Sequence, residues 1–167
     1  MPAQYVHGKV KAATAQMNRR AFLALGGAAL AIGLGSTAKQ SHAMKVNLEG
    51  DFAVEGYDAV AYQTQDAAVK GSDAFTATHE GATYLFSSAE NRDAFASNPA
   101  KYAPKYGGFC AYAVANGYTA PIDPEAFSVV DGALYLNFNK SVRRRWSRDV
   151  PGNIAKGDAN WPGLSAG

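Results

Sequence analysis

The apolar positions after residue 43 fall into short runs separated by glycine, proline, asparagine and aspartate. Two pairs of runs are apolar or alternate between apolar and polar residues, and a two-residue turn joins the members of each pair. This pattern predicts two β-hairpins, Ala74–His79 with Thr83–Phe86 and Phe127–Val130 with Ala133–Leu136. A further apolar run, Gly56–Tyr62, predicts a short buried strand after a glycine turn.

Helix start and stop signals lie between these strands. Ser87, with Glu90 three residues later, predicts an N-cap and a capping box. The helix that follows should run through Phe95 and end before Pro99, because the residue before a proline avoids the helical conformation. Pro99–Ala103 predicts one further helical turn.

Three more helices are predicted in the second half. Phe109–Ala115 favours a short buried helix, because alanines and a following Asn-Gly suit one, although a buried strand remains the alternative. Asn139 can cap a helix that carries Arg143–Arg145 on its polar faces, and Pro151 suits the first turn of the last helix. Hairpins interleaved with short helices predict a small single domain of the α+β class.

Residues 1–43 have the composition of an export leader. They hold five Lys and Arg residues and no acid, with paired arginines at Arg19-Arg20, a weakly apolar run to Gly35 and a small-x-small end at Ala43. The order Arg-Arg-x-Phe-Leu resembles a twin-arginine signal. An ordinary secretory signal and an uncleaved amphipathic anchor are the alternatives. Met17 is an alternative translation start.

Residues 44–167 are expected to form the exported domain, in the periplasm or an equivalent compartment. They hold 11 Lys and Arg against 14 Asp and Glu, a net charge of −3. A mildly acidic domain lacks the basic footprint of nucleic-acid binding. The apolar run of the leader is too short and too rich in glycine for a stable helix across ~30 Å of hydrocarbon. We therefore expect no nucleic-acid partner and no stable membrane insertion once the leader is removed.

Several motifs together resemble the YHS-domain family, in particular its exported, selenoprotein-like branch. The resemblance covers roughly residues 46–164. It is carried by five segments, which are Gly56–Tyr62, Gly81–Arg92, Pro99–Tyr102, Tyr106–Tyr112 and Asp158–Pro162.

This resemblance implies two things about chemistry. The metal-handling relatives carry three cysteines, whose positions correspond here to Ala61, Ser87 and Asn91, so the thiolate centre of that branch is missing. Some members of the exported branch carry selenocysteine at the position of Cys110. A selenol there points to redox chemistry or to soft-metal ligation.

The supply of imidazole and sulfur groups restricts any metal site. If the leader is removed after Ala43, only His79, Cys110 and Met44 remain. Type 1 copper, di-iron and three-histidine zinc sites need more of these ligands than one chain then offers. A soft metal ion, copper first, is the metal that Cys110 with His79 would bind.

The thiol has a second interpretation. In the first turn of a helix, just after Gly107 and Gly108, Cys110 would meet unpaired N–H groups that favour the thiolate and lower its pKa. The glycines would let a ligand or another backbone approach closely, and Tyr112 is a further pocket candidate. The tyrosines nearby could wall such a pocket or pack core edges, and they are Tyr102, Tyr106, Tyr112 and Tyr118.

Three hypotheses on function follow. The first is an exported binding module for a soft metal ion or a small molecule, held through Cys110 with help from His79. The second is a thiol-dependent redox enzyme in which Cys110 is a nucleophile of low pKa that passes through sulfenic acid or a mixed disulfide. The third is an interaction domain in which Cys110 is an inert core residue. Asp58 is expected either as a turn former or as a buried acid.

Overall fold

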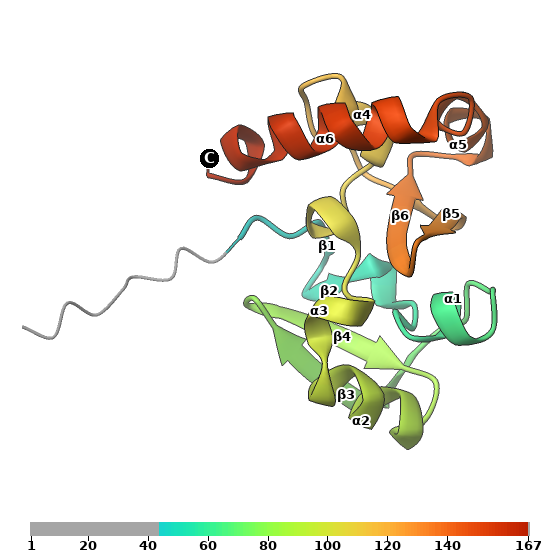
Figure 1. The fold of residues 1–167 in the computed structure, drawn as a ribbon. Coiled ribbons are helices and arrows are strands. Elements are labelled where there is room, and N and C mark those ends of the chain that lie inside the picture. Colours follow the sequence, from blue (N-terminus) through green and yellow to red (C-terminus); the bar gives the residue numbers. More distant parts are fainter. Residues whose placement is uncertain (1–43, 167) are drawn as a thin grey trace, which may run out of the picture. The chain divides into compact units, whose positions relative to one another are not determined.

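A computed structural model describes residues 44–166, which form a small α+β domain as the sequence predicts (Figure 1). Strands and helices alternate along the chain. The strands are β1 (Leu48–Glu49), β2 (Phe52–Ala53), β3 (Ser72–His79), β4 (Ala82–Phe86), β5 (Asp123–Val130) and β6 (Ala133–Asn137). The α-helices are α1 (Ala61–Thr64), α2 (Ala89–Ser97), α3 (Pro99–Tyr102), α4 (Ala111–Ala115), α5 (Lys140–Trp146) and α6 (Val150–Ser165), with 3-10 turns η1 (Val54–Gly56) and η2 (Lys105–Gly108).

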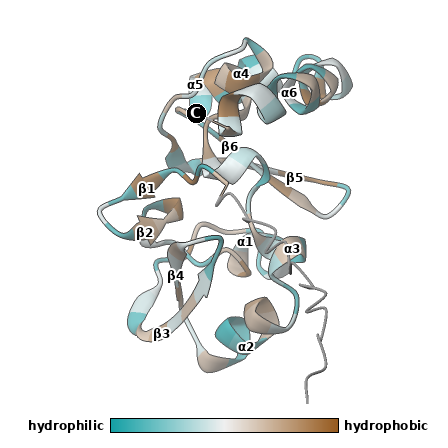
Figure 2. Ribbon diagram, turned by 90° about the vertical axis from the view of Figure 1, so that its left-hand side faces the viewer, coloured by the Kyte–Doolittle hydropathy of each residue, from teal (hydrophilic) through white to brown (hydrophobic). Residues whose placement is uncertain are grey.

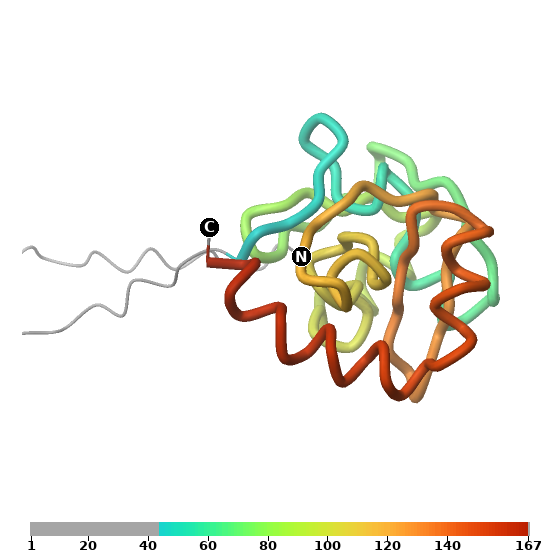
Figure 3. The backbone as a smooth tube through the Cα atoms, turned by 90° about the horizontal axis from the view of Figure 1, so that it is seen from above, coloured from blue at the N-terminus to red at the C-terminus, as the bar shows by residue number. Residues whose placement is uncertain are grey.

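The strands form two sheets. One has the order β1-β2-β4-β3, in which β2 and β4 run parallel and the other pairs antiparallel; the second is the antiparallel pair β5-β6. Both predicted hairpins are confirmed, because His79 pairs with Ala82 and Val130 pairs with Ala133 across the two turns. Helix α2 packs on β3 and β4, whereas α5 packs on β5 and α4 contacts both β6 and α6. The views from the front and from above show α6 extending along one side of the second half (Figures 1 and 3).

Most helix boundaries follow the predicted signals. Helix α2 ends before Pro99, the Asn139 side chain accepts from the Val142 N–H at the start of α5, and α6 begins with Pro151 in its first turn. The prediction of Ser87 as the cap of α2 is wrong by one residue. Ser88 is the N-cap and accepts from the Asn91 N–H at 3.2 Å. The hydroxyl of Ser87 instead donates to the Asp58 carboxylate.

The predicted strand over Gly56–Tyr62 does not form. A 3-10 turn ends at Gly56, a single bridge joins Tyr57 to Lys70, and the following residues enter α1. The cause is the carboxylate of Asp58, which accepts from the N–H groups of two residues at the start of α1 and bends the chain into a helical turn. An apolar run of this length has no period that separates helix from strand.

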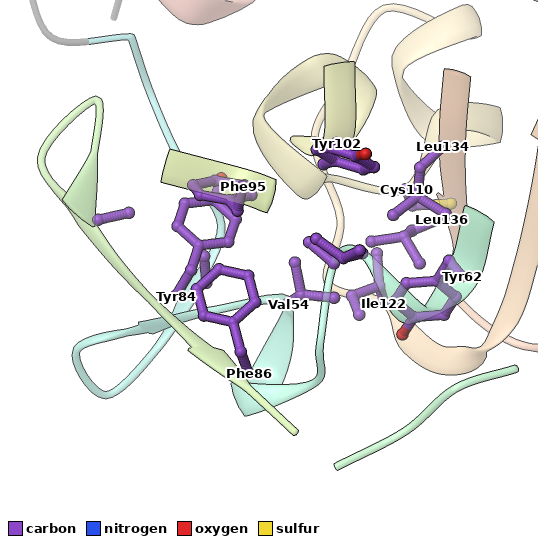
Figure 4. Packing of buried hydrophobic residues seen from close by; sticks show 14 of the residues in the cluster. Val54, Tyr62, Tyr84, Phe86, Phe95, Tyr102, Cys110, Ile122, Leu134 and Leu136 are labelled. Atoms are coloured by element: carbon purple, nitrogen blue, oxygen red, sulfur yellow. The ribbon is translucent and has the colours of Figure 1, made fainter. Parts of the chain in front are cut away.

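The core has two parts. The larger cluster fills the space between the four-stranded sheet, α2 and β6, and its residues come from both halves of the chain (Figure 4). The smaller cluster surrounds Trp146, which is fully buried between α4, β6 and α6. Figure 2 shows hydrophobic residues in α4, whereas α2 is partly hydrophilic. Cys110 at the start of α4 and Asn137 at the end of β6 are both buried and lie beside each other.

The predicted leader, residues 1–43, lies outside the described residues. Among residues 44–166, no helix combines the length and the apolar character that a membrane crossing requires.

Candidate functional site

Cys110 stands at the N-cap of α4. The prediction of a short helix is confirmed for Ala111–Ala115, but the expectation that Cys110 lies within its first turn is wrong by one residue. Tyr106 and Gly107 adopt left-handed φ angles of 57° and hold the preceding segment in a separate 3-10 turn. The chain is then extended at Phe109, so the helix begins only after Cys110.

The sulfur of Cys110 meets the end of β6. The N–H of Phe138 donates to Sγ at 3.2 Å, and the side-chain oxygen of Asn137 lies 3.9 Å from Sγ. That oxygen also accepts from the N–H of Tyr112 at 3.3 Å, which ties the start of α4 to β6. Asn137 is fully buried, and its Nδ2 has no hydrogen-bond partner among the described residues. Sulfur therefore has one directed N–H donor and one amide oxygen beside it.

A cavity of about 280 Å³ opens onto Cys110. Although Cys110 itself is only 1% exposed, it lines this cavity. Two half-exposed aromatic side chains, Tyr118 and Phe138, stand at its edge. We call the space the Cys110 cavity, and its lining is Cys110, Tyr112, Ala113, Tyr118, Ala120, Phe138, Val142 and Arg145.

His79 lies in a different place. It ends β3, its imidazole packs edge-on against Phe95 with ring centroids 6.0 Å apart, and its Nε2 is 3.8 Å from the Glu80 carboxylate. Figure 4 shows Phe95 and Cys110 at opposite sides of the core cluster. Cys110 and His79 line different cavities. The structure does not bring the two predicted metal ligands together.

The cavity beside His79 measures about 320 Å³. Met44, the other sulfur group of the predicted domain, also lines it, as do Glu80 and Asp158. Among residues 44–166, no three His, Cys, Asp or Glu side chains group as ligands of one metal ion would.

Two motif segments of the chain meet at this second cavity. Tyr106 from η2 donates from its hydroxyl to the Asp158 carboxylate at 3.0 Å, and Trp161 packs beside it with ring centroids 6.0 Å apart. Burial, together with the hydrogen bond to Asp158, raises the pKa of Tyr106 well above its ordinary value. Tyr106 therefore stays a neutral hydrogen-bond donor that fastens η2 to α6.

The predicted pocket residues are distributed between the two cavities. Tyr112 lines the Cys110 cavity, whereas Gly107 lines the cavity beside His79, and Gly108 lines neither. The tyrosines also divide, because Tyr118 joins Tyr112 while Tyr106 joins Gly107. Only Tyr112 of the three pocket candidates accompanies Cys110.

A third cluster forms around Asp58, and sequence reasoning missed its extent. Asp58 is fully buried, and its two oxygens accept five hydrogen bonds. One oxygen accepts from the N–H groups of Val60 and Ala61, and the other from the N–H and hydroxyl of Ser87 and from the amide of Asn91. The three positions that the family resemblance aligns with cysteines, Ala61, Ser87 and Asn91, thus surround one carboxylate. The one sequence signal for this cluster was that Ser87 and Asn91 are polar residues able to donate hydrogen bonds to a buried carboxylate.

Comparison with known proteins adds no relative. The chain matches no protein-family model, no curated protein sequence and no solved structure. The resemblance to the YHS-domain family accordingly rests on its sequence motifs.

Proposed function

We propose that this chain is an exported binding module of the YHS type that holds its ligand in the Cys110 cavity, with sulfur as the principal contact. The observation that supports the proposal is that the single thiol of the chain lines a cavity although it is 1% exposed. Protein interiors contain few voids larger than a water molecule, so a cavity beside a buried cysteine is compatible with ligand binding there. The export step is inferred from the twin-arginine-type leader.

A soft metal ion, copper(I) first, is the ligand to test at the sulfur. Thiolate is the protein ligand that copper(I) prefers, and copper(I) accepts low coordination numbers. Because His79 lines another cavity, Cys110 would be the one soft protein donor here. A second donor would come from a small solute molecule or from a partner.

Copper(I) binding is expected to depend on Cys110 and not on His79. The full chain should compete with a colorimetric copper(I) chelator for about one equivalent, because a single thiolate is available. Cys110→Ser should abolish this binding, whereas His79→Ala should retain it. Binding that survives Cys110→Ser and is lost with His79→Ala would move the metal to the cavity of Met44 and His79 and overturn this proposal.

A thiol-dependent redox reaction is the second candidate, and the contact between Phe138 and Cys110 favours it. An N–H donor 3.2 Å from sulfur can stabilise a negative charge on a thiolate or a sulfenate. In this reaction the thiolate sulfur attacks one oxygen of hydrogen peroxide, the O–O bond breaks, and sulfenic acid and hydroxide form; a proton from solvent converts the hydroxide to water. The chain has no second cysteine, so an external thiol must reduce the sulfenic acid.

The redox candidate predicts rapid chemistry at Cys110 in the folded protein. Peroxide should convert Cys110 to a sulfenic acid that a dimedone-type reagent traps, and one equivalent of copper(I) should leave this reaction unchanged. Protection of the thiol by copper(I) would favour the metal instead. Alkylation that occurs only after unfolding would contradict both candidates and leave Cys110 as a packing residue.

A further inference from the structure

The edge of the Cys110 cavity carries exposed aromatic surface. Tyr118 is 53% exposed and Phe138 is 49% exposed, and both belong to the small set of large apolar side chains left in solvent among residues 44–166. They come from different segments, the loop after α4 and the residue after β6, and they meet at one cavity. Apolar surface that converges at an opening is typical of a binding site and not of scattered exposure.

Among Lys, Arg, Asp and Glu side chains, only a basic one lines this cavity. Arg145 is the single charged residue in the lining, and no carboxylate is present there. Arg145 forms no salt bridge with any residue of 44–166. Its neighbour Arg143 instead donates to the Phe127 carbonyl at 3.0 Å and so is engaged in the fold. A free guanidinium beside an apolar opening attracts an anion that has an apolar body.

We infer that the Cys110 cavity selects a small organic anion, whose charged group binds Arg145 and whose apolar body lies against Tyr118 and Phe138. The inference rests on the proposed use of this cavity as the ligand site, but not on a bond to sulfur. A volume of about 280 Å³ suits a ligand of one or two rings. A bare metal ion would use neither the aromatic edge nor the guanidinium.

The test uses matched probes and matched variants. The affinity of the full chain for 2-naphthoate, for the neutral 2-naphthamide and for the cationic 2-naphthylmethylamine is measured by isothermal titration calorimetry. Naphthoate should bind most tightly. Arg145→Gln should weaken naphthoate about tenfold, as the loss of one charge-assisted contact would, and leave naphthamide unchanged. Arg144→Gln is the control, since Arg144 is an exposed arginine on the same helix that lines neither cavity.

A second variant tests the aromatic edge. Tyr118→Ala should weaken naphthoate and naphthamide alike, by about tenfold, because both lose the same apolar contact. Equal affinity for naphthoate and naphthamide, an equal effect of Arg144→Gln and Arg145→Gln, or no binding of naphthoate would each overturn the inference.

Cys110→Ser separates this inference from the proposed function. Naphthoate should bind this variant as it binds the unchanged chain, since sulfur is not its anchor. If the unchanged chain binds naphthoate but not copper(I), the sulfur-based function alone is overturned. If the unchanged chain binds copper(I) but not naphthoate, the organic-anion site alone is overturned.

Discussion

Asp58→Ala is expected to lower the free energy of unfolding by about 4 kcal/mol, because it leaves several buried donors unpaired at once. The carboxylate lies 2.6 Å from the Ser87 hydroxyl, 2.7 Å from the Asn91 amide and 2.8 Å from the Ser87 N–H. These are short, charge-assisted contacts, and they join the start of α1 to the start of α2. Urea unfolding followed by circular dichroism measures the change.

Asp58→Asn is the sharper variant. The amide keeps the shape of the carboxylate, but its NH2 group must face donors whichever way it is turned, because both oxygens accept in the native protein. We expect a loss of about 3 kcal/mol. Asp73→Asn is the control, since Asp73 is exposed on β3, and its effect should stay within about 0.5 kcal/mol.

The double variant of Asp58 and Asn91 checks whether the cluster acts as a unit. Once Asp58 is replaced by alanine, Asn91→Ala should cost less than it costs in the unchanged chain, because its partner is already gone. Additive effects would contradict the network. A loss below about 1 kcal/mol for Asp58→Ala would contradict the larger claim that this carboxylate holds α1 and α2 together.

The Asp58 cluster gives the resemblance to metal-handling proteins a physical reading. Ala61 lies far from Ser87 and Asn91 in sequence, yet all three converge on one buried point. Thiolates at such a point could share a metal ion. Here the Ser87 hydroxyl, the Asn91 amide and the Ala61 N–H instead donate hydrogen bonds to the Asp58 carboxylate.

Local signals were sufficient to predict much of the fold. The hairpin turns at Glu80-Gly81 and Asp131-Gly132 fix both strand pairs, and Asn139 and Pro99 fix helix boundaries through contacts within a few residues. The failure at Gly56–Tyr62 has a local cause, because the Asp58 carboxylate accepts from N–H groups two and three residues later and an apolar run hides that signal. What no local pattern shows is that Ser87 and Asn91 donate to the same carboxylate. The Asp58 carboxylate takes the hydroxyl of Ser87, so Ser88 is the cap of α2 instead.

The candidate site was predicted only in part, for a similar reason. Cys110 and Tyr112 are close in sequence and do share a cavity. Arg145 and Phe138 reach the same cavity from segments about thirty residues away, which no local pattern indicates. His79 is separated from Cys110 because they belong to opposite sides of one core, and a count of available ligands carries no information about that separation.

Gly107→Ala is expected to destabilise the domain strongly, by about 3 kcal/mol, through strain and a direct clash. Gly107 has a left-handed φ of 57°, which costs an alanine about 1 kcal/mol. A Cβ atom there would also clash with the Lys45 carbonyl oxygen, a contact that backbone atoms cannot relieve without moving. The N–H of Asn47 donates to the Gly107 carbonyl at 2.8 Å, so the first described residues would lose their attachment to η2.

Gly132→Ala separates the two causes. Gly132 has a left-handed φ of 75° in the β5–β6 turn, but nothing lies within 4 Å of an added Cβ atom. Its replacement should cost only the backbone strain, about 1 kcal/mol, measured by the same urea titration. If both variants lose the same stability, close approach of the N-terminal segment contributes nothing. A larger loss for Gly107→Ala would show that Gly107 serves to admit a neighbouring backbone, and its presence beside the second cavity would then require no ligand.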